Sequence, residues 1–174
     1  LFLGPQETYT TGIRNQINNL PGKLTWVALK PGSREYLAAL FTANANFDAA
    51  NIYVYVRRVG TPIANLTVEL CSSSGGVPDA VLQTATITTT TIDDIDARFY
   101  KAAITAQALS SGTLYWVKVY SSGGTDQDHW KIGISTTAGA SKESADGTTW
   151  SASGIDLYYR VTDAETTKYP LLFR

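Results

Sequence analysis

Short runs of alternating apolar and polar residues, separated by Gly, Pro, Ser, Thr and Asp, recur through the middle of the chain. The clearest of them are Ile52 to Val59, Leu66 to Cys71, Leu114 to Tyr120, Trp130 to Ile134 and Ile155 to Val161. A side-chain period of two is typical of β-strands, and strands separated by turns every ten or so residues are typical of a sandwich or barrel. The pattern predicts an all-β protein, an antiparallel β-sandwich of jelly-roll type with about eight or nine strands.

The rest of the chain divides into less regular segments. Further strands are expected at Thr25 to Leu29, Val81 to Thr91 and Ala97 to Ile104, whereas Glu35 to Thr42 fits a helix or a strand equally well. We therefore expect an N-terminal arm over residues 1–40, a sandwich domain over 41–162 and a C-terminal tail over 163–174. Both ends carry intermittent hydrophobic residues in a polar background. Such segments either order against a partner or complete their own sandwich, and the sequence leaves both open.

Several of the expected strands are apolar or aromatic on both sides. Tyr53, Tyr55 and Arg57 alternate with the apolar residues that begin at Ile52. The outer faces of a two-layer sandwich are ordinarily polar, so something else is expected to cover this one: the arm, a neighbouring subunit or a ligand. Aromatic residues and Arg are typical of interface cores. The interface residues expected on this basis are Tyr53, Tyr55, Arg57, Trp116 and Phe173.

Composition narrows the possible partners. The chain has 174 residues, a formal net charge of -1 and no Met, so Leu1 is expected to be a processed terminus or an internal position of a longer product. The interspersed charges argue against a nucleic-acid partner. Cys71 is the single cysteine, which excludes an intrachain disulfide and favours a small buried hydrophobe. No apolar run is long enough to predict a membrane span.

Candidate catalytic groups are few. His129 is the one histidine, and a nucleophilic triad would need it to meet an acid and a hydroxyl or thiol. The cluster of Asp93, Asp94 and Asp96 fits solvated side chains or a guarded strand edge. Asp126 and Asp128 offer two oxygens to a calcium ion that takes six to eight. We expect no enzyme activity, no cofactor and no metal, while calcium at Asp126 and Asp128 stays open.

Exposed aromatic rings are the candidates for binding sugars, because pyranose rings stack on Trp and Tyr faces. Trp130 shares its face with Ile132 and Ile134 and is expected in the core. Trp150 lies in a turn, and it is either a lid over the core or an exposed platform. The candidate ligand-binding residues are Trp150, Tyr158 and His129.

Six short segments, taken in order, resemble the extracellular β-sandwich modules called choice-of-anchor domains. They are Val56 to Pro62, Leu66 to Leu70, Gly75 to Pro78, Gly112 to Val117, Asp146 to Trp150 and Asp156 to Val161. Similar modules occur in surface proteins of bacteriophages and other virions. The resemblance covers 41–162 and implies a non-catalytic structural or adhesive module of a virion surface (capsid decoration or tail type) or an extracellular assembly. The aromatic and Arg face separately predicts protein subunits of the same assembly as partners, in a homo-oligomer. The alternative is a carbohydrate-binding module that attaches a particle or an enzyme to glycans.

Overall fold

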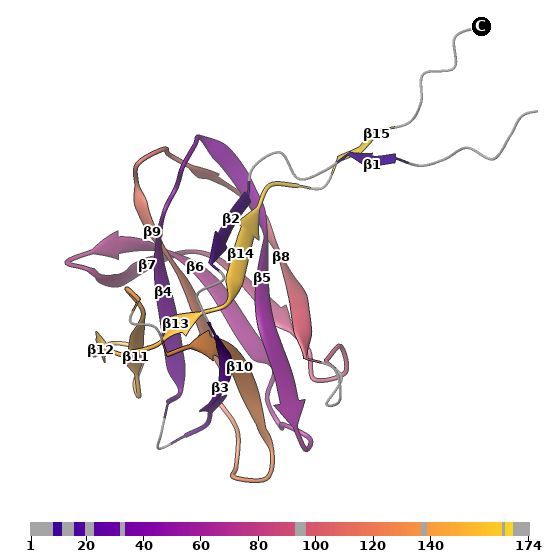
Figure 1. Cartoon of the computed structure of the whole chain (residues 1–174), viewed down its shortest axis with the longest axis vertical. Helices are drawn as coiled ribbons and strands as arrows, with labels where there is room; N and C mark the ends of the chain where they lie inside the picture. Colours follow the sequence, from indigo (N-terminus) through magenta and orange to yellow (C-terminus); the bar gives the residue numbers. More distant parts are fainter. Residues whose placement is uncertain are drawn as a thin grey trace, which may run out of the picture.

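Two antiparallel sheets packed against each other form the body of the protein, and most buried side chains lie between them (Figure 1). The computed structural model describes residues 9–11, 16–19, 23–31, 34–92, 97–136, 139–164 and 166–168. These residues contain strands and turns but no helix. The predicted all-β antiparallel sandwich is confirmed.

Eight main strands make up the two sheets. The first sheet has the order β3 (Leu24–Leu29), β10 (His129–Ser135), β5 (Phe47–Val59) and β8 (Arg98–Leu109). The second sheet has the order β4 (Tyr36–Thr42), β9 (Leu114–Tyr120), β6 (Leu66–Ser74) and β7 (Val77–Ile87). The chain crosses to the other sheet at every connection between these strands except the one from β6 to β7. This strand order, which the sequence does not give, is that of a jelly roll.

Seven shorter strands bring the total in the described residues to fifteen. The first sheet gains β14 (Tyr159–Thr162) beside β5, β2 (Gln16–Asn19) beside β14, and β13 (Asp156–Leu157) beside β10. The second sheet gains β11 (Lys142–Ser144) and β12 (Ser151–Ala152). Apart from the sheets, β1 (Tyr9–Thr11) pairs with β15 (Thr166–Lys168) (Figure 1). Most of these strands are too short to show an alternating pattern, which is why the sequence predicts fewer.

The predicted boundary at residue 41 falls inside β4, because residues of the expected arm belong to the sandwich. In β3, Val27 packs against the core and Leu29 lies within it. The segment that fitted helix or strand equally well is a strand, with Leu37, Ala39 and Phe41 facing the core between its neighbours β9 and β11. Tertiary pairing therefore decides a segment whose local preference is ambiguous. The expected boundary at residue 162 coincides with the end of β14.

Alternation determines what lies in the core. In β5, Ile52, Val54 and Val56 point inward and are fully buried, and the residues between them point outward. Trp130 fills the core as predicted, and its indole N–H donates a hydrogen bond to the Ala64 carbonyl at 2.9 Å. Burial of each large apolar side chain stabilises the fold by roughly 1.5–3 kcal/mol. The β6–β7 hairpin turns at Gly75 and Gly76, which both have the positive φ that a type I′ two-residue turn requires.

Candidate functional site

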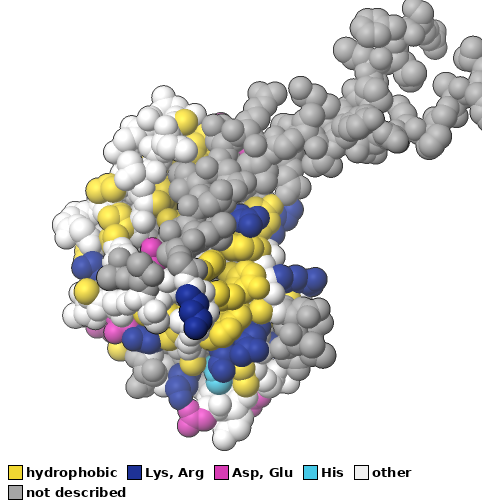
Figure 2. Space-filling view, viewed as in Figure 1, with side chains coloured by type: hydrophobic (Ala, Val, Ile, Leu, Met, Phe, Trp, Pro, Cys, Tyr) yellow, Lys and Arg dark blue, Asp and Glu magenta, His cyan; other side chains and the backbone are white. Residues whose placement is uncertain are grey.

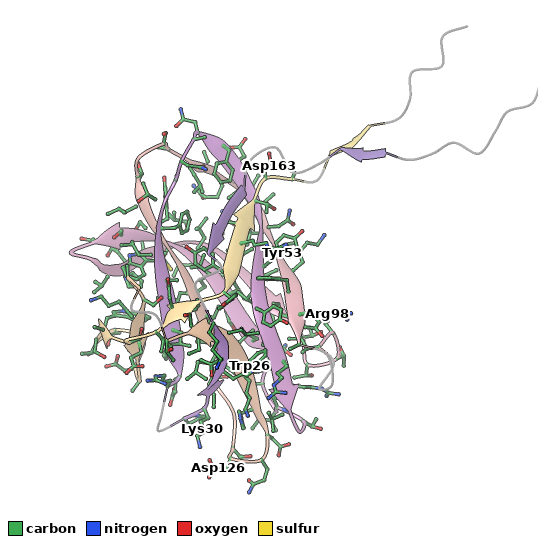
Figure 3. The ribbon with its side chains drawn as sticks, viewed as in Figure 1. Trp26, Lys30, Tyr53, Arg98, Asp126 and Asp163 are labelled. Carbon is green, nitrogen blue, oxygen red and sulfur yellow. The ribbon has the colours of Figure 1, made fainter. Side chains whose placement is uncertain are left out.

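A cluster of aromatic and arginine side chains lies on the outer face of the first sheet. We call it the Tyr55 cluster; its members are Trp26, Tyr55, Arg57, Phe99, Tyr158 and Arg160. All six side chains are partly exposed. Figure 2 shows hydrophobic side chains on this face with Lys and Arg around them, and Figure 3 labels Trp26, Tyr53 and Arg98 over the same sheet. The two sheets and their pairing thus place an apolar, positively charged surface toward solvent.

Tyr55 lies at the centre of this cluster. Its ring centroid is 5.6 Å from that of Trp26, 5.0 Å from that of Phe99 and 6.3 Å from that of Tyr158. Strand pairing explains the arrangement: Phe99 is the partner of Tyr55 on β8, and the Tyr55 N–H donates to the Tyr158 carbonyl at 3.1 Å. Gly133 on β10 leaves room for the ring, because a Cβ there would lie 2.7 Å from Tyr55 Cδ1.

The two arginines of the cluster lie over aromatic rings. Arg57 Cζ is 4.8 Å from the centroid of the Trp26 ring, and Arg160 Cζ is 4.2 Å from that of the Phe99 ring. Cation–π attraction holds a guanidinium in such a position. The Nε atoms of both arginines are buried without a hydrogen-bond partner, and within the described residues neither side chain pairs with a carboxylate.

The same face carries further positive charge. Lys131 on β10 is the strand neighbour of Arg57, and Lys101 on β8 is the neighbour of Tyr53. Residues 51–59 of β5, all of β10 and all of β14 contain no Asp or Glu. The whole chain has a net charge of -1, but this face is basic. Its local positive potential, which the overall composition does not show, would attract anionic groups.

Part of the outer face of the second sheet is covered by a loop of the chain itself. Trp116 is fully buried in a small cluster with Ala38 and Cys71, against which Trp150 packs. The Trp116 indole N–H donates to Ser73 Oγ at 3.0 Å. Burial raises the pKa of the Cys71 thiol to about 11. Trp150 is therefore a lid, and it covers an outer face instead of the main core.

The loop that carries Trp150 is held by Asp146. Its carboxylate accepts hydrogen bonds from the backbone N–H groups of Thr149 and Thr148 and from the Ser144 hydroxyl. These bonds hold the pKa of Asp146 well below its usual range. Beside the loop is an open hollow of about 300 Å³, whose wall includes Arg34 and Glu143. Those two residues pair with each other, so neither offers an unpaired charge to a ligand.

His129, Asp126 and Asp128 stabilise the loop before β10 through hydrogen bonds and an ion pair. The His129 side chain is buried, with Nδ1 at 3.1 Å from the Thr125 carbonyl oxygen. Asp128 accepts a hydrogen bond from the Thr61 N–H at 2.6 Å, and Asp126 pairs with Lys30, which lowers the Asp126 pKa (Figure 3). The two carboxylates thus have different partners. Across the described residues, no three His, Cys, Asp or Glu side chains gather as a metal-binding group.

The structure brings together some of the residues expected from sequence and separates others. Tyr55, Arg57 and Tyr158 share one cluster, and Tyr53 lies on the same face. Trp116 and Trp150 lie on the other sheet, so Trp150 and Tyr158 do not form one sugar platform. Phe173, Asp93, Asp94 and Asp96 lie outside the described residues.

Three members of the cluster are absent from the sequence expectations: Trp26, Phe99 and Arg160. Trp26 alternates with Val27 and Leu29 in an expected strand, and Phe99 alternates with buried Tyr100. That alternation could have placed both on an outer face, but it could not show that they meet at Tyr55.

Comparison with protein-family models, with curated proteins and with solved structures finds no match to this chain. In the part of the chain that the structure describes, no helix is long and apolar enough to cross a membrane.

Proposed function

We propose that the chain is a non-catalytic structural or adhesive module that works through protein contacts made by the Tyr55 cluster. The observation that carries this proposal is the partial exposure of four aromatic rings and two arginines on one sheet face of a single chain. A solvated sheet face ordinarily carries polar residues, whereas aromatics and Arg are enriched where interfaces are buried. The resemblance to choice-of-anchor modules supports a place on a virion surface or in an extracellular assembly.

A second copy of the chain is the first partner to test, because most assemblies of this kind are homo-oligomers. Sedimentation velocity from about 1 to 100 µM would measure self-association over the range of weak to moderate interfaces. Tyr55→Ser is expected to weaken self-association at least about tenfold, since central aromatic anchors carry much of the binding energy. Tyr36→Ser is the matched control, because Tyr36 stacks on Tyr120 at the second sheet.

The oligomeric state of the wild-type chain is the critical measurement. If it stays monomeric at about 100 µM, with the cluster still open to solvent, self-assembly through this face is contradicted. Equal effects of Tyr55→Ser and Tyr36→Ser would also contradict it, because the loss would then follow from general destabilisation.

Carbohydrate binding is the second candidate function, favoured by the position of Trp26 and Tyr158 on the open face. Binding on a glycan array is expected to fall in Trp26→Ala and Tyr158→Ala. Trp150→Ala should leave glycan binding unchanged, since Trp150 packs against the other sheet. An array on which the wild-type chain binds no glycan would remove this candidate.

A further inference from the structure

Within the described residues, the arginines of the Tyr55 cluster have no acidic partner, unlike three other cations of the chain. Lys30 pairs with Asp126, Arg34 with Glu143, and Lys118 with Glu69. Arg57 and Arg160, by contrast, make no ion pair within the described residues, and their Nε atoms are buried and unbonded. A guanidinium without a carboxylate partner gains more from an incoming anion than a paired one does.

The contacts between the aromatic rings and these arginines affect which kind of ligand the face can bind. One face of the Trp26 ring is taken by Arg57, and one face of the Phe99 ring is taken by Arg160. Trp26 also stacks on Tyr55. These contacts leave less ring surface on which a neutral sugar could stack, whereas a guanidinium held over a ring keeps N–H donors at its edge for a carboxylate.

The positions of the two guanidinium groups are set by the rings beneath them. Arg57 lies over Trp26 and Arg160 lies over Phe99. These two rings flank the Tyr55 ring, with centroids 5.6 and 5.0 Å from it. In an extended peptide, alternate residues point the same way, so two acidic side chains on one side of a peptide can face two guanidinium groups.

We propose that the partner of this face is an acidic polypeptide segment in extended form, with Asp or Glu side chains on one side that engage Arg57 and Arg160. This inference rests on the protein-contact function proposed above and adds the chemistry of the partner. An apolar residue midway between the two acids would lie on Tyr55. Charge complementarity between a basic face and an acidic segment also speeds association.

Short peptides test the proposal directly. The probe is a fluorescein-labelled peptide with the core Glu-Thr-Val-Thr-Glu, and its control has Gln at both ends of the core. We expect fluorescence anisotropy at low salt to show binding of the acidic peptide alone. Arg57→Gln and Arg160→Gln should each weaken that binding about tenfold, the loss expected for one charge-assisted pair.

Two further variants separate geometry from charge. Arg57→Lys keeps the charge but loses the planar fork, so it should also weaken peptide binding severalfold. Arg34→Gln is the matched control and should bind like the wild type, because Arg34 pairs with Glu143. Equal affinity for acidic and Gln peptides, or binding unaffected by both Arg57→Gln and Arg160→Gln, would overturn the proposal.

The alternatives give different results in the same assay. Tighter binding of a heparin fragment or of a single-stranded oligonucleotide of equal charge would show a polyanion site of another class and overturn the acidic-peptide proposal. If Tyr55→Ser weakens assembly but Arg57→Gln and Arg160→Gln do not, the acidic partner is wrong while the protein-contact function stands. If none of the three changes assembly or peptide binding, both proposals fail.

Discussion

The outer faces of the two sheets contain similar residues but differ in the packing and charge partners of those residues. On the second sheet, Trp150 covers Trp116. Glu69 forms an ion pair with Lys118 and also accepts a hydrogen bond from the Tyr120 hydroxyl. On the first sheet, the rings around Tyr55 stay partly exposed, and the arginines over them lack carboxylate partners in the described residues. Aromatic and charged groups on a sheet are therefore not by themselves a sign of function. What distinguishes the first sheet is that its arginines lie over partly exposed rings without a carboxylate partner in the described residues.

The largest expected difference between the faces is in stability. Trp116→Ala removes a fully buried ring and should lower the free energy of unfolding by about 3–5 kcal/mol. Trp26→Ala removes a partly exposed ring and should cost about 1 kcal/mol. Urea denaturation of both variants measures the difference. Similar losses would mean that the first face is as much a part of the folding core as the second.

The charged residues should show the same contrast. Lys118→Ala leaves Glu69, which is 6% exposed, without its cation, and breaking such a buried pair should cost about 3 kcal/mol. Arg57→Ala breaks no ion pair in the described residues and should cost less than about 1 kcal/mol. The same denaturation experiment applies. A large loss in Arg57→Ala would indicate a structural role for that guanidinium.

Cys71 offers a probe of the lid. Because it is buried beside Trp116 and its raised pKa keeps the thiol protonated at pH 8, its reaction with a thiol reagent should be slow in the native protein. Trp150→Ala should speed the reaction about tenfold by opening the cover. Trp26→Ala serves as the control and should leave the rate unchanged. Equal rates in all three proteins would show that Trp150 does not protect this face.

The smallest expected effect is a response of the lid to acid. Hydrogen bonds from Thr149, Thr148 and Ser144 hold the folded-state pKa of Asp146 below its unfolded value, which is about 3.9. The stabilisation that these bonds give is therefore complete above about pH 4 and is lost as the pH falls through the lower, folded-state pKa. Near-ultraviolet circular dichroism should show the Trp150 environment loosening in acid. Asp146→Asn should remove that transition.

Much of the fold could be predicted from alternation, because each main strand shows which residues enter the core. Ile52, Val54 and Val56 point inward, and Tyr53 and Tyr55 outward, as their spacing indicates. Alternation does not say which strands become neighbours. Trp26, Phe99 and Arg160 come from three distant segments and meet only through the pairing of β3, β8 and β14 around β5 and β10.

The sequence likewise could not show that Trp116, expected at an interface, would be covered by the chain. Its outward position could be anticipated from the strand pattern, but the return of the loop that carries Trp150 could not. A sequence pattern assigns a residue to one side of a sheet. Whether another part of the chain covers that side depends on contacts between distant segments.

The end-to-end placement of two strands along β5 has a consequence for how the protein is made. One edge of β5 pairs with β14 at residues 51–54 and with β10 at residues 56–59. Neither partner exists on the ribosome until most of the chain has been synthesised. Because such long-range pairings must wait for late segments, we expect the first sheet to close slowly, after β10 and β14 have been synthesised. Until then the edge of β5 is open to pairing with other chains, so the nascent protein is most prone to misassociation at the very strand that bears Tyr55.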